Sequence, residues 1–158
     1  MRISLCLGIL LALFNSVKGE EWRGIKPLCS TRADVEQILG QPLEANGRVY
    51  RLENEWATVT YSDGVCSQEF EDWDVPKDTV LSISVRSGLK LFSELKVDSA
   101  KFVKIHEHIQ AIFYYKNKED GILYYVNGDY INAVLYFPSA KDNRLLCPKV
   151  EKKNTTTQ

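Results

Sequence analysis

The sequence has few of the residue patterns that mark catalytic or cofactor-binding proteins. It contains two histidines and four cysteines among 158 residues, and no C-x-x-C pair of the kind that holds structural zinc. It has no G-x-S-x-G element for a serine nucleophile and no glycine-rich phosphate loop. We therefore expect no cofactor, no resident metal and no catalytic residues.

The sequence also lacks an excess of positive charge. Lysine and arginine total 20, against 21 acidic residues. A chain without a basic stripe has little to neutralise phosphates, which argues against a nucleic acid as partner. The same balance argues against a basic membrane-surface role.

Long apolar runs are scarce, and the clearest one lies at the start. Residues 3–14 are uncharged and mainly apolar, but this run is shorter than the ~20 residues that a membrane-spanning helix needs. Arg2 precedes it, and Val17 and Gly19 fit the −3 and −1 positions of a signal-peptide cleavage site. We expect residues 1–19 to be a signal peptide, so that the protein is exported to the periplasm or outside the cell with no membrane span remaining.

The rest of the chain is long enough for one domain with a sizeable core. We expect this domain at residues 20–148. Residues 149–158 are polar and include a threonine run, so we expect a disordered tail.

Residues 30–42, S-T-R-A-D-V-E-Q-I-L-G-Q-P, contain both the start and the stop of a helix. The serine and threonine can cap the first turn, and the glycine followed by proline ends the last one. Val35, Ile38 and Leu39 recur at helical spacing and would share one face. The pattern predicts a short helix that lies on a sheet.

β-Strand patterns follow this helix. β-Branched and aromatic residues are concentrated at residues 49–52, 56–61, 79–85 and 131–137, with a hairpin expected at 53–55. We therefore predict an α+β fold, with an antiparallel sheet of about six strands and one or two short helices on one face.

The two halves of the chain are similar in plan. Two pairs of tyrosines coincide at an offset of 64 residues, Tyr50 with Tyr114 and Tyr61 with Tyr125. Residues 98–105, capped by Asp98, would supply a second short helix. The pattern suggests a tandem helix–three-strand repeat at residues 28–87 and 91–138, although two unrelated hairpins would share part of it.

Three cysteines remain after the signal peptide, and in an exported protein this number indicates one disulfide and one thiol. Cys66 and Cys147 each follow a strand segment and precede an irregular one, so we expect these two to pair. Cys29 would then lie outside the disulfide, beside the start of the helix. Spacing alone leaves the other pairings open.

Three phrases of the sequence carry a resemblance to a known family. They are G-I-K-P-L-C-S-T-R-A-D-V-E-Q-I-L-G-Q-P at 24–42, V-P-K-D-T-V-L-S-I-S-V at 75–85 and A-K-D-N-R-L-L-C-P at 140–148. Together they resemble a family of small exported bacterial proteins that is abundant in soil acidobacteria. The resemblance covers most of the mature chain and brings no catalytic residues to it.

A broader resemblance concerns the fold. A capped helix ending in L-G-x-P, followed by a three-stranded meander, is similar to the unit of the SmpA/OmlA (BamE-like) outer-membrane lipoproteins, which the β-lactamase inhibitor protein carries in tandem. Thr31, Val35, Leu39, Gly40 and Pro42 stand at the matching positions. The glycine that usually precedes that helix and the lipid-bearing cysteine are missing here. The resemblance therefore implies a binding or scaffolding module without a membrane anchor.

His106 and His108 are the only histidines in the sequence. On a strand, both imidazoles would point to one side and could reach one ion. A third ligand is not apparent nearby, and two protein ligands hold a metal weakly, so we favour a solvated linker. A small metal-assisted hydrolase that uses this histidine pair is the alternative function.

Residues 65–75 form an irregular stretch with the acidic and aromatic segment E-F-E-D-W-D at its centre. Phe70 and Trp73 could present an aromatic anchor to a partner, because tryptophan is enriched at binding hot spots. The interpretation that we favour folds both rings back over one end of the core, with the acidic groups in water.

Tyrosines crowd into the second half of the chain, and four of them are candidate partner-binding residues, Tyr114, Tyr124, Tyr125 and Tyr130. A helix covers one face of a sheet, so an aromatic face left open would suit a protein or glycan partner. Equally, the hydroxyls would make an outer face tolerable to water. The function that we expect is non-catalytic binding or scaffolding in the bacterial envelope. The protein would contact a protein partner through this face and the loop at 65–75.

Overall fold

The fold is an antiparallel sheet with short helical segments. The computed structural model describes residues 21–44, 47–66, 73–88, 90–106 and 111–148. The strands are β1 (Val49–Arg51), β2 (Glu55–Tyr61), β3 (Val80–Ser87), β4 (Val103–His106), β5 (Ile112–Asn117), β6 (Ile122–Asn127) and β7 (Tyr130–Tyr136). The helical elements are α1 (Arg32–Leu39) and the 3-10 turns η1 (Phe92–Glu94), η2 (Ser99–Lys101) and η3 (Ala140–Leu145).

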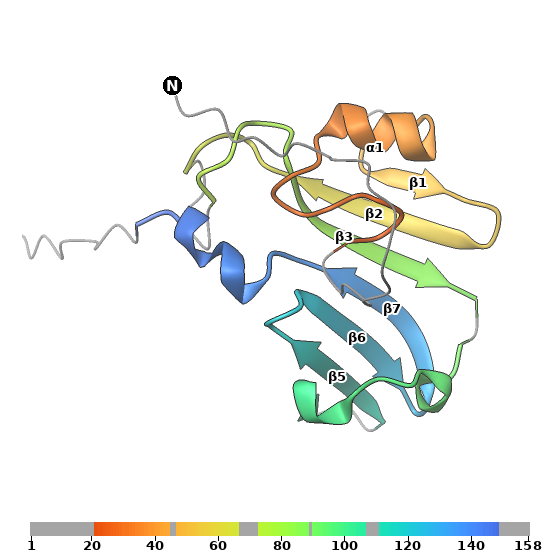
Figure 1. The fold of residues 1–158 in the computed structure, drawn as a ribbon. Helices are drawn as coiled ribbons and strands as arrows, with labels where there is room; N and C mark the ends of the chain where they lie inside the picture. The colour runs from red at the N-terminus through yellow and green to blue at the C-terminus, as the bar shows by residue number, and fades with distance from the viewer. Residues whose placement is uncertain (1–20, 45–46, 67–72, 89, 107–110, 149–158) are drawn as a thin grey trace, which may run out of the picture.

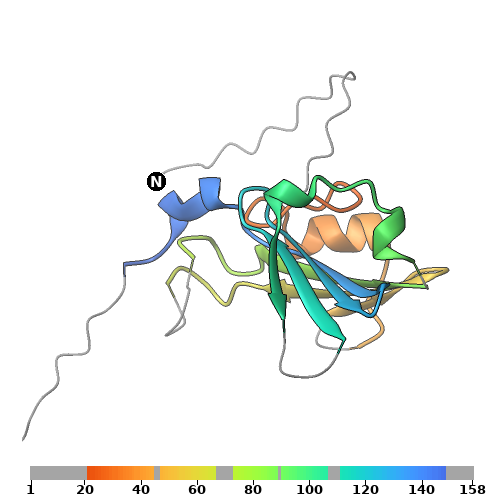
Figure 2. The same ribbon diagram turned by 90° about the horizontal axis from the view of Figure 1, so that it is seen from below.

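All seven strands belong to one sheet, in the order β1-β2-β3-β7-β6-β5-β4, and every neighbouring pair is antiparallel. Figure 1 shows α1 over the end of the sheet that holds β1 and β2. In Figure 2, α1 and the two 3-10 turns η1 and η2 lie on the same side of the sheet. We call this side the inner face and the opposite side the outer face. The α+β fold class and the antiparallel sheet predicted from the sequence are confirmed.

The first helix forms where the sequence predicts it. Thr31 caps it, because its side chain accepts a hydrogen bond from the Asp34 backbone N–H while the Asp34 carboxylate accepts one from the Thr31 N–H. Gly40 ends it at φ 83°, a conformation that glycine adopts without a Cβ clash. Val35 is fully buried, but Ile38 is 46 % exposed, so the apolar face of α1 is narrower than predicted.

The core lies between the inner face and the elements that cover it. Its buried residues come from the N-terminal arm (residues 21–28), α1 and the first three strands: Trp22, Ile25, Val35, Tyr50, Ala57, Val59, Tyr61, Val80, Ile83 and Val85. Burying side chains of this size is the main favourable term in folding, at ~25 cal/mol per Å² of apolar surface. The N-terminal arm is therefore part of the folded domain.

A bulge explains an irregularity in the sequence of β3. Val80 and Ile83 break the alternation expected of a strand, yet both are fully buried. The register between β2 and β3 shifts at Thr60/Tyr61, so that Tyr61 pairs with Val80 while Val59 pairs with Ile83. The extra residue on β3 returns both apolar side chains to the inner face.

The sheet contains two three-stranded meanders, β1-β2-β3 and β5-β6-β7, which meet where β3 pairs with β7, and β4 adds a seventh strand beside β5. The two meanders correspond to the three strands of each predicted unit, but no α-helix precedes the second one among the described residues. The offset of 64 residues, however, aligns positions on opposite faces: Tyr61 is buried on the inner face, whereas Tyr125 lies on the outer face opposite Tyr114. A shift of one residue exchanges the faces of a strand, so these tyrosines are not structurally equivalent.

The predicted second helix at residues 98–105 is wrong. Asp98 does cap a helical turn, since its carboxylate accepts a hydrogen bond from the Ala100 N–H, but the turn is only η2. The chain then enters β4, which pairs with β5 from Val103↔Lys116 to His106↔Phe113. Alternation of β-branched and polar residues suits a strand, and a helix this short has no apolar face sufficient to stabilise it.

The predicted disulfide is present between Cys66 and Cys147, whose Cα atoms lie 5.7 Å apart. Cys29 takes no part in this disulfide and is half-buried. The bond joins the loop after β2 to the segment after η3. Two backbone contacts reinforce this junction, because Trp73 forms a bridge with Leu146 and the Asp74 N–H donates to the Leu145 carbonyl at 2.7 Å.

Candidate functional site

The outer face of β4 to β7 carries a continuous set of apolar side chains. The strand register places Ile105 opposite Tyr114, Tyr114 opposite Tyr125, and Leu123 opposite Leu135. Side chains directly opposite on antiparallel strands share a face. We define the apolar patch as these residues together with their outward neighbours: Val103, Ile105, Tyr114, Leu123, Tyr125, Leu135 and Phe137.

The centre of the apolar patch is a pair of tyrosine rings. The ring centroids of Tyr114 and Tyr125 lie 5.1 Å apart with the planes tilted by 43°. Packing of this kind holds the rings on the sheet, so they lose less freedom when a second surface covers them. Beside them, the Lys116 ammonium lies 5.2 Å from the centroid of Phe137.

The most exposed part of the apolar patch lies on β4. Val103 is 66 % exposed and Ile105 is 45 % exposed, which is high for β-branched side chains on a strand. Tyr130, at the start of β7, is 49 % exposed and pairs with Asn127 at the far end of the hairpin. Of the tyrosines predicted to contact a partner, Tyr114 and Tyr125 come together here, and Tyr130 lies at the periphery.

Tyr124 lies on the other side of the sheet. It is opposite Tyr115, and both rings contact Phe92, with centroid distances of 5.5 Å for Tyr124 and 4.1 Å for Tyr115. Phe102 packs against Tyr124 as well, at 5.6 Å. Burial raises the pKa of the Tyr124 phenol above its ordinary value. The structure therefore separates Tyr124 from the other predicted tyrosines.

Phe92 is held in place by Asp129. The Phe92 N–H donates to the Asp129 carbonyl at 2.7 Å, and the Ser93 N–H donates to the Asp129 carboxylate at 3.0 Å. The segment before η1 also joins β7, since the Ile131 N–H donates to the Lys90 carbonyl. These contacts place Phe92 over Tyr115 and Tyr124, so this part of the inner face of the second meander is covered.

The loop predicted to contact a partner is described only in part. Trp73 is half-buried and forms its bridge with Leu146, close to the disulfide. Phe70 lies outside the described residues. The interpretation in which both rings fold back over one end of the core therefore stays a prediction.

The histidine pair is also described only in part. His106 ends β4 and its ring stacks on Phe113, with centroids 4.8 Å apart. His108 lies outside the described residues. Among the residues that the structure describes, no group of three or more histidine, cysteine or acidic side chains could hold a metal ion.

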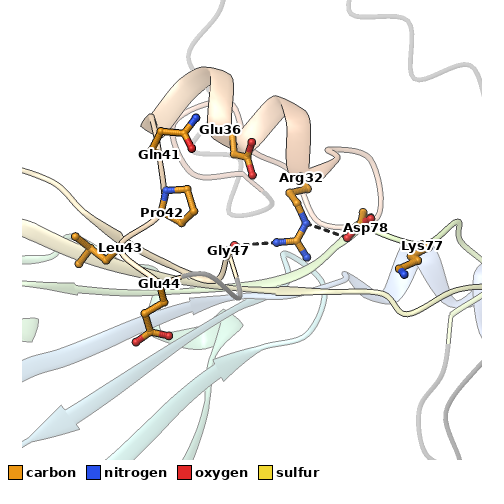
Figure 3. A pocket seen from close by; sticks show the side chains of 9 residues that line it. All are labelled: Arg32, Glu36, Gln41, Pro42, Leu43, Glu44, Gly47, Lys77 and Asp78. Atoms are coloured by element: carbon orange, nitrogen blue, oxygen red, sulfur yellow. Dashed lines mark hydrogen bonds and ion pairs between the residues drawn. The ribbon is translucent and has the colours of Figure 1, made fainter.

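A cleft of about 640 Å³ lies between α1 and two loops, and no sequence pattern predicted it. Its lining includes Arg32, Glu36, Glu44, Lys77 and Asp78. Figure 3 shows the Arg32 side chain extending from α1 between Asp78 and the Gly47 carbonyl. Its guanidinium donates to the Asp78 carboxylate at 2.9 Å and to the Gly47 carbonyl at 3.1 Å.

Arg32 also covers a buried pair of tyrosines. Its guanidinium carbon lies 4.0 Å from the ring centroid of Tyr61, and the Tyr61 and Tyr50 hydroxyl oxygens are 3.0 Å apart. Burial, with the hydrogen bond to Tyr50, raises the pKa of the Tyr61 phenol far above its ordinary value. These contacts connect α1 to the first meander, so they account for Arg32 as a structural residue.

Two further findings do not concern a particular site. Comparisons with protein-family models, with curated proteins and with solved structures find no match. No helix within the described part of the chain has the length and apolar character needed to cross a membrane.

Proposed function

We propose that this chain is an exported, non-catalytic binding protein of the bacterial envelope, and that it contacts a protein partner through the apolar patch. The observation that carries the proposal is the continuous apolar surface over β4 to β7, with the Tyr114–Tyr125 pair at its centre. Val103 and Ile105 are exposed and the other members of the apolar patch are half-buried. Contiguous apolar surface that solvent still reaches marks interaction sites. Tyrosine, with an apolar ring and a polar tip, is enriched in such surfaces.

The chemistry of the apolar patch favours binding over catalysis. Its members are aliphatic and tyrosine or phenylalanine side chains, and Lys116 is the ionisable neighbour that contacts it. Proton transfer and nucleophilic attack need titratable groups within hydrogen-bond reach of one another. A surface of this composition is suited to exclusion of water by a complementary surface.

Export is supported by the Cys66–Cys147 disulfide, because disulfides persist in oxidising compartments. The predicted signal peptide at residues 1–19 points the same way. The proposed contribution of the loop at 65–75 rests on sequence alone, since Phe70 and its acidic neighbours lie outside the described residues.

The proposal is tested by capture of a partner from the native envelope and secreted fractions with immobilised residues 20–158. A Tyr114→Ser, Tyr125→Ser variant removes both rings of the apolar patch. A Thr58→Ala, Ser84→Ala variant serves as the matched control, because both residues lie on the outer face of the first meander. A protein that the wild type and the control capture and the tyrosine variant loses would support the proposal. Equal capture by all three would refute it.

A further inference from the structure

The two edges of the sheet differ in how they are closed. At the β1 edge, the Val49 carbonyl already accepts a hydrogen bond from the Leu43 N–H at 2.7 Å, so the chain's own loop occupies that edge. β4 forms the other edge. Among the described residues, no backbone hydrogen bond or strand occupies the edge of β4 that faces away from β5. An edge of this kind presents N–H and C=O groups that can pair with another strand.

The side chains of β4 alternate sharply in character. Val103 and Ile105 point to the outer face and extend the apolar patch to the edge. Lys104 and His106 point to the inner face, where the Lys104 ammonium lies 3.9 Å from the ring centroid of Phe113 and His106 stacks on the same ring. A strand beside β4 would therefore meet apolar groups on one face and basic groups on the other.

This alternation disfavours a second copy of the chain as the added strand. In antiparallel pairing, opposite side chains share a face. Centring two copies on Lys104 would place the two lysines opposite each other, and centring them on Ile105 would place each Lys104 opposite His106. Like charges directly opposite each other destabilise a strand pair, so Lys104 disfavours self-association through this edge. The same lysine would favour a partner strand with acidic side chains.

We propose that the outer edge of β4 accepts an extended segment of the protein partner, in which acidic residues alternate with apolar ones. The acidic side chains would face Lys104 and His106, and the apolar side chains would continue the surface of Val103 and Ile105. Backbone hydrogen bonds supply affinity in this mode and alternate side chains supply specificity. The inference rests on the proposed function and adds the chemistry of the partner's contact segment.

The test uses fluorescence anisotropy with a labelled peptide of alternating glutamate and valine. Two control peptides accompany it: one replaces glutamate with lysine, and the other has the same composition with glutamates and valines in separate blocks. We expect the mature chain to bind the alternating acidic peptide and to bind both controls more weakly. Equal binding of the block peptide would overturn the proposal, because simple charge attraction would then suffice.

Charge exchange sharpens the test. A Lys104→Glu variant should lose about tenfold in affinity for the acidic peptide, the effect of replacing one cross-strand attraction by a repulsion, and should gain affinity for the lysine peptide. Lys101→Glu is the matched control, because Lys101 is exposed on η2 outside the strand, and it should leave both affinities unchanged. Equal effects of the two variants would overturn the proposal.

The two proposals fail separately. If no peptide binds but the envelope capture succeeds and depends on Tyr114 and Tyr125, the edge inference falls and the proposed function stands. If neither experiment shows binding, both fall.

Discussion

On the outer face of the first meander the side chains are mainly polar, whereas on the outer face of the second they are mainly apolar. β2 and β3 present two hydroxyl-bearing pairs there, in which Thr58 lies opposite Ser84 and Thr60 opposite Ser82. The change occurs where the meanders meet, because Ser84 is also opposite Leu135 of β7. Trp56 is the large apolar exception on the first meander, and the Arg51 guanidinium lies 5.4 Å from its ring.

This difference shows what the fold does and does not require. Both meanders cover their inner faces, the first with α1 and the N-terminal arm and the second with Phe92 and Phe102. The first meander folds with hydroxyl-bearing side chains on its outer face, and antiparallel sheets commonly have one polar, solvated face. The fold therefore does not require tyrosine, leucine and isoleucine on the second outer face, which is consistent with the binding role proposed for them.

The largest expected effect concerns the bond that ties the first meander to the end of the chain. Replacing both Cys66 and Cys147 by serine should lower the free energy of unfolding by about 4 kcal/mol. The reason is that the disulfide joins residues 81 positions apart and so restricts the chain entropy of the unfolded state. Urea unfolding of the variant and of the oxidised wild type measures the difference. A change below about 1 kcal/mol would show that backbone contacts alone hold this junction.

A substitution on each face of β3 compares inner packing with the polar outer face. Ile83→Ala should cost about 3 kcal/mol, because Ile83 is fully buried and its removal leaves a cavity. Ser84→Ala, on the next residue and the opposite face, should change stability by less than about 0.5 kcal/mol. The urea unfolding midpoints of the two variants measure these losses. Similar losses would mean that side-chain packing on the outer face of the first meander also contributes to stability.

Tyr136 allows a pH test of the inner face of the second meander. Burial, with smaller contributions from Tyr124 and Glu55, raises its pKa to about 12, against ~10 for a phenol in the unfolded chain. As the pH rises, the unfolded state therefore releases the Tyr136 proton before the folded state does. The stability that the protonated Tyr136 phenol contributes is complete below pH 10 and is lost as the pH rises to about 12. We expect a loss on the order of 2 kcal/mol across that interval.

The control for this test is Tyr136→Phe, which has no phenol to ionise. Its unfolding free energy, measured at pH 10 and pH 12, should fall less than that of the wild type. Equal slopes in the two proteins would place the alkaline sensitivity elsewhere, for example at Tyr61.

The smallest effect is expected from adding an aromatic ring to the polar outer face of the first meander. Thr58→Tyr adds one aromatic ring to the polar half, at an exposed position of β2. It should change stability by no more than about 0.5 kcal/mol and should leave capture of the partner unchanged, because a single surface apolar group is not a patch. Stronger capture by this variant would show that any exposed ring on this sheet suffices.

The sequence predicted those features whose signals are local. The capped helix from Thr31 to Gly40, the β1–β2 hairpin and the strand around Ile83 follow from capping residues and β-branched alternation. The disulfide between Cys66 and Cys147 followed from the placement of cysteines at strand ends.

The features that were missed depend on residues far apart in the chain. β4 is a strand because β5 pairs with it, and the cap at Asp98 gave the stronger local signal of a helix. Which tyrosines are covered depends on Phe92, which reaches Tyr124 from a separate segment. The cleft at Arg32 arises because the helix meets Asp78, 46 residues away along the chain. The resemblance to the BamE-like unit remains a prediction.

The most direct measurement of the central claim is site-specific photocrosslinking in the native envelope. A photoreactive phenylalanine analogue at position 125 would report on the apolar patch, and the same analogue at position 58 would report on the polar half of the same outer face. We expect one protein to be crosslinked from position 125 and none from position 58. Crosslinking of the same protein from both positions, or from position 58 alone, would contradict it.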